Sequence, residues 1–365
     1  MDFDFAAREH LQVPTESHAS RGSHTVLVYG AYGLTGRFVV TELIRRGLTP
    51  VLAGRSADGL AALAELHPDL HVRRAAADDP ESLDLALVGV DAVINCAGPF
   101  LDTAMPVAEA ALRSKVSYLD IAAEQPSTTS LFSDLDARAG TAGVTALPAM
   151  GFFGALADLL ATLTMGDWPD ADSIEIATAL EGWRPTAGTL MTGTRNVEPH
   201  RELRAGRLTP NDPSRVTAWD FPPPFGRAEL VPLSLGETVL LSQHLKVPEI
   251  RAGINSRSLE DLADPDLPRR TAGQDRTPVQ QAFVIDVAVT RGTSTRRGSV
   301  HGNDIYGVTA PIVVEATVRL LAGLPSGVLA AGAAFDPAAF LDSLPVYLTR
   351  DGASHPTEPS RGSLS

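Results

Sequence analysis

Thr25-Val-Leu-Val-Tyr-Gly30-Ala-Tyr-Gly33-Leu-Thr-Gly36 is the stretch that decides the fold of this chain. A short apolar run leads directly into glycines at positions 30, 33 and 36. The pattern is typical of a buried parallel strand that turns tightly at Gly30 into a helix whose N-terminus faces a phosphate. Gly33 lets the backbone approach the phosphates, and Gly36 allows the helix to pack closely on the strand. The stretch therefore predicts a dinucleotide-binding unit.

A second apolar run, Val51-Leu-Ala53, ends in Gly54-Arg55-Ser56. Proteins that bind the unphosphorylated dinucleotide usually carry an acid here, which holds the ribose 2′-OH. A guanidinium can instead bind a 2′-phosphate with two hydrogen bonds, and the Ser56 hydroxyl can add another. The sequence therefore favours NADP(H) over NAD(H), although a single arginine at a strand end is often only a solvated side chain.

The sequence does not match two other classes of nucleotide-binding protein, the ATP-binding phosphate-loop proteins and the short-chain dehydrogenases. Arg37 and Phe38 follow Gly36, where an ATP-binding phosphate loop has a lysine and a serine or threonine. The chain has only two lysines, Lys115 and Lys246, and neither has a tyrosine four residues before it. The Tyr-x-x-x-Lys pair of short-chain dehydrogenases is therefore absent.

The composition of the chain limits the kinds of partner that it can bind. The chain has 365 residues, 44% of them hydrophobic, so it can bury a sizeable core and is expected to form two domains. Its formal charge of −14 argues against nucleic acid and anionic membranes as partners. Cys96 is the only cysteine, so we expect no internal disulfide. His67 and His71 have the spacing of two metal ligands on one helix, but Pro68 breaks that geometry, so we expect no metal site. We expect a cytoplasmic homodimer that acts on a small molecule.

The order of strand and helix patterns predicts the architecture. They alternate over the first 150 residues, which indicates an α/β fold with a Rossmann-type doubly wound parallel sheet. From about residue 170 strand-like runs follow without regular helices, which indicates an inserted α+β domain with an antiparallel sheet. The expected divisions are a disordered lead-in (1–23), an NADP-binding Rossmann domain (24–150), a substrate and dimerisation domain (151–320), a segment returning to the Rossmann domain (321–350) and a loose tail (351–365).

Further motifs stand where predicted strands end. They are Asn95-Cys-Ala-Gly-Pro-Phe100, Tyr118-Leu-Asp120 followed by Glu124, and Pro148-Ala-Met-Gly-Phe152 with Asp158. Together with the glycine turn and Ala53-Gly-Arg55, they make the chain resemble the saccharopine dehydrogenase-like oxidoreductases, which include trans-acting enoyl reductases. The resemblance covers most of residues 25–345. It implies a Rossmann domain, an α+β insert, NADP(H), and reduction or oxidation at C=N or C=C bonds.

Cofactor contacts are expected at the carboxyl ends of the parallel strands. Cys96 is more often a small core residue than a nucleophile in such a strand. Asp78 and Asp79, at the end of the third predicted strand, could bind adenine or only cap the next helix, which begins at Pro80. The expected cofactor-binding residues are Gly30, Tyr32, Gly33, Leu34, Thr35, Gly36, Arg55, Ser56, Asp78, Asn95, Cys96, Ala97, Gly98, Pro99 and Phe100.

Four residues are candidates for delivering a proton to the reduced substrate. Tyr118, Asp120 and Glu124 follow the fifth predicted strand, and Asp158 interrupts an apolar stretch. Each also has a structural interpretation. The Tyr118 ring could simply pack, Asp120 could accept hydrogen bonds from loop amides, and Asp158 could stabilise the start of a helix.

Substrate contacts are expected from the second domain. Trp183, Arg184 and Thr189 lie at the start of a possible helix, whose N-terminus could hold a substrate carboxylate. His301 and Tyr306 lie where a strand joins a helix and could form a pocket wall. All five could equally belong to ordinary loops.

The sequence predicts an NADPH-dependent oxidoreductase that reduces an imine, an iminium or an activated alkene held between two domains. A non-catalytic protein that senses NADPH or a metabolite remains the alternative, because the sequence offers no decisive acid or base.

Overall fold

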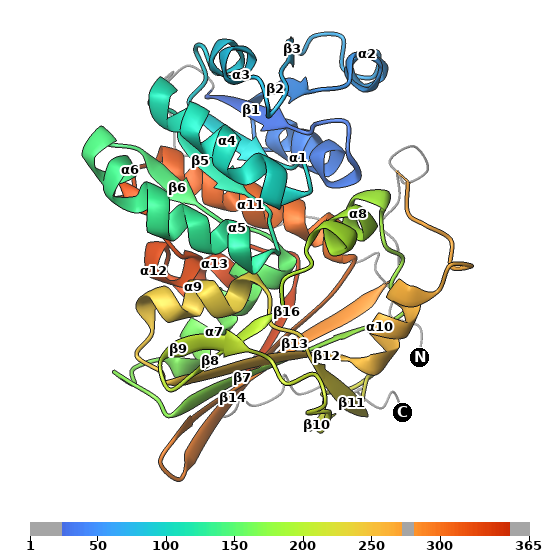
Figure 1. Cartoon of the computed structure of the whole chain (residues 1–365), viewed down its shortest axis with the longest axis vertical. Helices are drawn as coiled ribbons and strands as arrows, with labels where there is room; N and C mark the ends of the chain where they lie inside the picture. Colours follow the sequence, from blue (N-terminus) through green and yellow to red (C-terminus); the bar gives the residue numbers. More distant parts are fainter. Residues whose placement is uncertain (1–23, 272–280, 351–365) are drawn as a thin grey trace, which may run out of the picture.

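The computed structural model describes residues 24–271 and 281–350. The expected lead-in (1–23) and tail (351–365) lie outside these residues. Two β-sheets form the described part, one in the upper and one in the lower half of Figure 1, with helices between and around them.

The first sheet is parallel and has seven strands, in the order β15-β6-β5-β4-β1-β2-β3. This confirms the predicted Rossmann-type sheet. Its strands are β1 (Thr25–Tyr29), β2 (Thr49–Gly54), β3 (Val72–Arg74), β4 (Ala92–Asn95), β5 (Ser117–Asp120), β6 (Thr145–Leu147) and β15 (Gly327–Val328).

Helices cover both faces of this sheet, as the near-continuous apolar strands require. In β1, Val26 and Val28 are fully buried, and they belong to the same hydrophobic cluster as Val39 and Leu43 of the following helix. Burying each such side chain contributes roughly 1.5–3 kcal/mol. The helices are α1 (Leu34–Arg45), α2 (Ala57–Ala64), α3 (Pro80–Ala86), α4 (Phe100–Ser114), α5 (Gln125–Ser130), the π-helical turn η1 (Leu131–Leu135) and α6 (Asp136–Ala142).

The second sheet follows the order β10-β11-β12-β7-β13-β14-β16, with the β8–β9 hairpin attached to β12. Its pairs are antiparallel except β7 with β12, which run parallel, so the sheet is mixed. Its strands are β7 (Ser173–Leu180), β8 (Arg201–Arg204), β9 (Arg207–Pro210), β10 (Thr217–Asp220), β11 (Arg227–Pro232), β12 (Glu249–Asn255), β13 (Ala282–Arg291), β14 (Ser294–Asn303) and β16 (Tyr347–Arg350).

Helices between the two sheets join the domains into one body. The two domains share one hydrophobic core, which includes Val28 of the first sheet, Leu160 of α7 and Ile285 of the second sheet. The helices of this part are the π-helical turn η2 (Phe152–Leu156), α7 (Ala157–Met165), α8 (Ala187–Arg195), α9 (Gly236–His244), α10 (Ser256–Ala263), α11 (Ile305–Leu321), α12 (Ala331–Ala334) and α13 (Pro337–Leu341).

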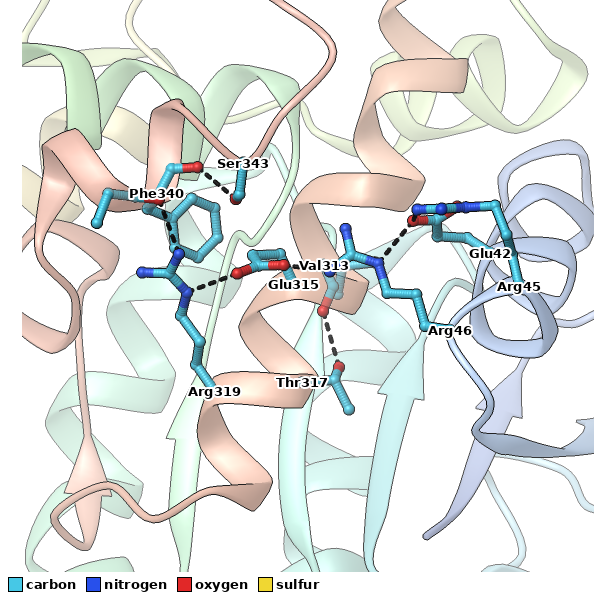
Figure 2. Close-up of polar contacts among 10 residues, drawn as sticks. Glu42, Arg45, Arg46, Val313, Glu315, Thr317, Arg319, Phe340 and Ser343 are labelled. Atoms are coloured by element: carbon cyan, nitrogen blue, oxygen red, sulfur yellow. Dashed lines mark hydrogen bonds and ion pairs between the residues drawn. The ribbon is translucent and has the colours of Figure 1, made fainter. Parts of the chain in front are cut away.

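Helix α11 runs back to the Rossmann sheet and packs against α1. Glu315 of α11 binds two guanidinium groups, that of Arg46, just after α1, and that of Arg319 one turn along α11. The Arg319 side chain also donates to the Ala339 carbonyl of α13 over 2.9 Å. Figure 2 shows this chain of ion pairs, which joins α1, α11 and α13. Beyond it, residues 321–350 contribute β15 to the first sheet and β16 to the second.

Candidate cofactor and substrate site

The glycine turn forms a tight cradle at the start of α1. Gly30 has φ +83°, and a Cβ there would lie 2.9 Å from Ala97. At Gly36 a Cβ would lie 2.3 Å from the Gly30 carbonyl oxygen. The N-cap Gly33 has extended backbone, and no side chain caps the helix. The N–H groups of the first turn are therefore presented to an anion by glycine backbone, which fits a pyrophosphate.

The end of β2 has the chemistry expected for a 2′-phosphate. Arg55 is exposed there, and its carbonyl accepts a hydrogen bond from Arg74 Nε over 3.1 Å. The Tyr32 ring covers Gly54, where a Cβ would lie 2.6 Å from it. The Ser56 hydroxyl accepts from the Gly59 N–H over 3.1 Å and so caps α2. The exposed guanidinium of Arg55 is compatible with a phosphate at this end of β2.

Asp78 and Asp79 lie between β3 and α3 and differ in their contacts. Asp78 is exposed just after β3, while Asp79 accepts from Ser82 N over 3.2 Å and caps α3. Of the two aspartates, Asp79 therefore caps the helix, as its position before Pro80 predicted.

Asn95 shapes the loop that follows β4. Its side-chain oxygen accepts from Ala97 N over 3.0 Å, and its amide donates to Thr103 Oγ1 over 3.2 Å. The neighbouring Cys96 lines the cavity described below. Burial raises the pKa of the Cys96 thiol, which keeps it protonated and supports its interpretation as a packing residue.

Tyr118 and Asp120 bind each other inside the domain. The Tyr118 hydroxyl donates to Asp120 Oδ2 over 2.8 Å, and both residues are fully buried. Asp120 Oδ1 accepts from the N–H groups of Ala122 (3.0 Å) and Ala149 (2.7 Å). Burial raises the pKa of Asp120 to about 6, although the backbone N–H groups oppose this rise. The pair ties β5 to the chain after β6, and neither side chain lines the cavity.

Asp158 lies in a different part of the core. Its Oδ1 is 2.7 Å from His244 Nε2 of α9, and its Oδ2 accepts from Gly332 N of α12 over 2.7 Å. The carboxylate therefore joins three helices and is absent from the cavity wall.

Glu124 is the one proton-donor candidate that reaches the cavity. Its Oε1 accepts from Phe100 N over 2.9 Å and its Oε2 from Ala123 N over 3.0 Å. The side chain is almost fully buried, and burial raises the pKa of its carboxyl group. Glu124 therefore combines a fixed position with an increased tendency to hold a proton.

The cavity lies between the two domains and has a volume of about 180 Å³. Rossmann strand ends and the second domain both contribute to it. Its lining residues are Thr35, Cys96, Gly98, Phe100, Ile121, Ala122, Ala123, Glu124, Phe152, Phe153, Trp183, Thr186, Gly188, Thr189, Thr192, Ile305, Tyr306 and Thr309.

Tyr306 organises the second-domain wall. Its hydroxyl accepts from Trp183 Nε1 (3.2 Å) and from Thr186 N (3.3 Å), and lies 2.8 Å from Thr189 Oγ1. Because two N–H groups already donate to this oxygen, its own proton is directed to Thr189. The structure thus brings together Trp183, Thr189 and Tyr306, as the sequence interpretation required.

The other two substrate candidates lie away from this wall. Arg184 is exposed and does not line the cavity. His301 lies on β14, where its Nε2 is 3.0 Å from Ser299 Oγ. Neither residue lines the cavity.

Helix α8 lies beside the loop after β4. A Cβ on Gly98 would lie 3.2 Å from Thr192 Oγ1 of α8. Arg195, in the last turn of α8, forms an ion pair with Asp102 of α4 over 2.9 Å. The helix therefore spans from the second domain to the Rossmann domain at the cavity.

Several cavity residues were not identified from the sequence. Ile121, Ala122 and Ala123 stand between the named Asp120 and Glu124, so their position alone could have indicated them. Phe153 follows the named Phe152 and Ile305 precedes the named Tyr306, so both could have been indicated in the same way, whereas Thr309 has no local signal.

Over residues 24–271 and 281–350, no group of three or more His, Cys, Asp or Glu side chains is arranged to hold a metal ion. In the same ranges, no helix has both the length and the apolar character needed to cross a membrane.

Residues 26–147 match the family model described as the saccharopine dehydrogenase NADP binding domain. This match confirms both the family resemblance and the expected cofactor, NADP(H).

Curated relatives point to the same family. The chain is 29% identical over 208 residues to a probable mitochondrial saccharopine dehydrogenase-like oxidoreductase of Arabidopsis thaliana, with 50% of this chain and 46% of that protein covered. It is 28% identical over 152 residues to a saccharopine dehydrogenase-like oxidoreductase of Bos taurus, with 37% of this chain and 35% of that protein covered. The match spans less than half the length of either relative.

A solved structure shares the fold of both domains. The apo saccharopine dehydrogenase (L-Glu forming) from Saccharomyces cerevisiae superposes with a TM-score of 0.62 at 14% identity, covering 90% of this chain and 100% of that one. At this identity the likeness shows the fold alone.

Proposed function

We propose that the chain is an NADPH-dependent reductase of C=N or activated C=C bonds in a small molecule, because residues 26–147 match the saccharopine dehydrogenase NADP binding domain and similar proteins are saccharopine dehydrogenase-like oxidoreductases. The observation that carries this proposal is the single cavity lined both by the strand ends of the NADP-binding domain and by aromatic side chains of the second domain. Ligands of such sheets bind outside the carboxyl ends of the strands, so the nicotinamide and the substrate would meet here.

The chemistry divides between cofactor and protein. NADPH, when bound, supplies the hydride. The protein's part is to position the substrate, exclude water and place a proton. Phe152, Phe153 and Trp183 give the cavity apolar walls that suit an uncharged, flat group.

Glu124 is the residue we propose for the proton. Its carboxyl group faces the cavity region with both oxygens held by backbone N–H groups. Burial raises its pKa, so the group can hold a proton at a higher pH than an exposed glutamate. The hydrogen bonds fix its orientation, which a proton donor needs.

The lining also limits the substrate. Among the described residues that line the cavity there is neither arginine nor lysine, and the one acidic side chain is Glu124. A substrate rich in carboxylates would bring uncompensated negative charge into this site. We therefore propose a neutral or cationic substrate, such as a cyclic imine, an iminium ion or an enone.

A panel of such compounds, assayed for NADPH oxidation by loss of its absorbance, tests the proposal. Glu124→Gln should lower turnover by about 10²–10⁴ while leaving NADPH affinity nearly unchanged. Glu65→Gln, at an exposed position just after α2, is the matched control and should behave as wild type. Tight NADPH binding without oxidation across the panel would favour the sensing alternative.

A further inference from the structure

A second, much smaller cavity lies in the second domain and is almost entirely apolar. Its volume of about 10 Å³ suffices for one group the size of a water molecule. Its lining includes Phe153, Ile176, Leu233, Leu235, Glu237 and Ile285.

Glu237, in the first turn of α9, is the polar feature of this cavity. Its side chain is 3% exposed. Oε1 accepts from Leu235 N over 2.7 Å and lies 3.4 Å from the donating Thr238 hydroxyl. Oε2 is buried and has no hydrogen-bond partner among the described residues. A buried oxygen without a partner is costly, so the position calls for an occupant that supplies one.

This cavity and the cofactor cavity share one lining residue. The Phe153 side chain lines both. In addition, the N–H of Gly236, next to Glu237, donates over 2.9 Å to the carbonyl of Ala123, which lines the cofactor cavity. The Phe153 ring is therefore the side chain that the walls of the two spaces share.

The carboxyl group is suited to donate a hydrogen bond. Burial raises the pKa of Glu237 to about 7. Since Oε1 already accepts two hydrogen bonds, the proton of the neutral form belongs on Oε2. The group then offers one O–H into an apolar space.

No second charge competes with this carboxyl group. None of the other residues that line its cavity is ionisable. Four acidic groups of neighbouring elements bind other partners: Asp158 binds His244, Glu124 binds backbone N–H groups, Glu202 binds Arg204, and Glu249 binds Arg251.

We propose that the Glu237 cavity is a substrate subsite, which takes the carbonyl or hydroxyl oxygen of an uncharged apolar substrate whose remainder lies in the cofactor cavity. This assignment rests on the proposed function, since it names the class of substrate for the same site. The size of the cavity admits a single oxygen, and the apolar wall rejects a charged group. A carboxylate is excluded on both counts.

Binding of cyclohexanone to the full chain saturated with NADPH tests the subsite. Infrared difference spectroscopy follows the C=O stretch of the protonated carboxyl group, which is assigned by its loss in Glu237→Gln. The ketone should shift this band, and Glu237→Leu should weaken ketone binding about tenfold, the equivalent of one hydrogen bond. Glu237→Gln keeps an N–H donor and should retain affinity, also at a pH above 7, where wild type should lose it. Cyclohexanecarboxylate should not compete.

Matched variants separate the subsite from a structural effect. Gln243→Ala changes an exposed position on the same helix and should leave ketone affinity unchanged. Phe153→Ala removes the shared wall and should speed ketone association, which gives a reading even if Glu237→Leu fails to fold.

An unshifted carboxyl band, or equal ketone affinity in wild type and Glu237→Leu, would overturn the subsite and leave Glu237 with a water molecule only. Because ketone binding is measured without turnover, it stands apart from the reductase test. NADPH and ketone binding with no oxidation of any panel compound would contradict the proposed function alone.

Discussion

The guanidinium of Arg195 lies 2.9 Å from the carboxylate of Asp102, and this pair joins the two domains beside the cofactor cavity. Arg195 ends α8, and Asp102 lies in the first turn of α4. Both side chains are about half exposed, so water and salt screen the pair. A contact of this kind holds α8 over the Gly98 loop without locking it there.

Asp102→Asn should therefore act on the cofactor more than on the fold. Losing an exposed ion pair costs roughly 0.2–1 kcal/mol, so NADPH should dissociate up to about 5-fold faster while the melting temperature barely changes. Stopped-flow displacement of NADPH measures the rate. Asp84→Asn removes the exposed pair with Arg113, away from the cavity, and is the control. Equal effects of the two variants would mean that α8 does not retain the cofactor.

Arg55 should decide between the two dinucleotides. A charge-assisted hydrogen bond to the 2′-phosphate contributes roughly 1.5–3 kcal/mol. Arg55→Ala should accordingly weaken NADPH by about 10- to 150-fold and leave NADH almost unchanged. Arg55→Asp should repel NADPH further and could gain a bond to the NADH ribose. Titration of both cofactors against the variants gives the answer, and an equal loss for both would assign Arg55 to the fold.

The cofactor cradle could be predicted because its geometry is local. Gly30, Gly33 and Gly36 meet within one strand, turn and helix, and each is required by a contact within that unit or with the adjacent strand end. The mixed second sheet and the wall of the cavity depend instead on segments far apart in the sequence. Phe153 and Thr309 are more than 150 positions apart, yet they line the same space.

The proton-donor candidates on β5 show what the sequence could not predict about single side chains. Tyr118 and Asp120 are two residues apart on a strand, so they share one face, and that face is buried against helices. Alternation along the strand could have indicated that the two side chains would bind each other. Glu124 follows the end of the strand, where the chain leaves the sheet. Its side chain lines the cavity.

Glu237 should make the protein less stable as the pH rises. Burial raises its pKa from 4.5 to about 7 in the folded state, so the folded protein holds this proton more tightly than the unfolded chain. Its stabilising effect is complete below the unfolded pKa and is lost as the pH rises through the folded one. At about 1.4 kcal/mol per pKa unit, the loss amounts to about 3 kcal/mol.

Denaturant unfolding of wild type and Glu237→Gln over this pH range measures the effect. The variant cannot ionise, so its stability relative to wild type should increase by that amount between about pH 4 and pH 8. A constant difference across the range would contradict a raised pKa for Glu237.

The ion pairs of Glu315 should act in the opposite pH direction. Burial alone would raise the pKa of this carboxyl group, but the hydrogen bonds from Arg46 and Arg319 outweigh it and lower the pKa. The stabilisation is therefore present above the unfolded pKa and is lost as the pH falls through the folded one. Glu315→Gln should cost roughly 1.5–3 kcal/mol near neutral pH and nothing at acid pH, where the wild-type carboxyl is protonated.

Glu315 lies on the same helix as two residues of the cofactor cavity wall. The same helix, α11, begins with Ile305 and Tyr306 in the cavity wall, so a change at Glu315 loosens the far end of an element that carries cavity residues. Glu315→Gln should then raise the Km for a substrate of the panel by a few fold, while NADPH affinity stays close to wild type because the cradle at α1 is intact. Glu109→Gln, which breaks an exposed pair with Arg138, is the control for the lost charge. A stability difference that persists unchanged at acid pH would mean that packing, rather than the two guanidinium groups, accounts for the role of Glu315.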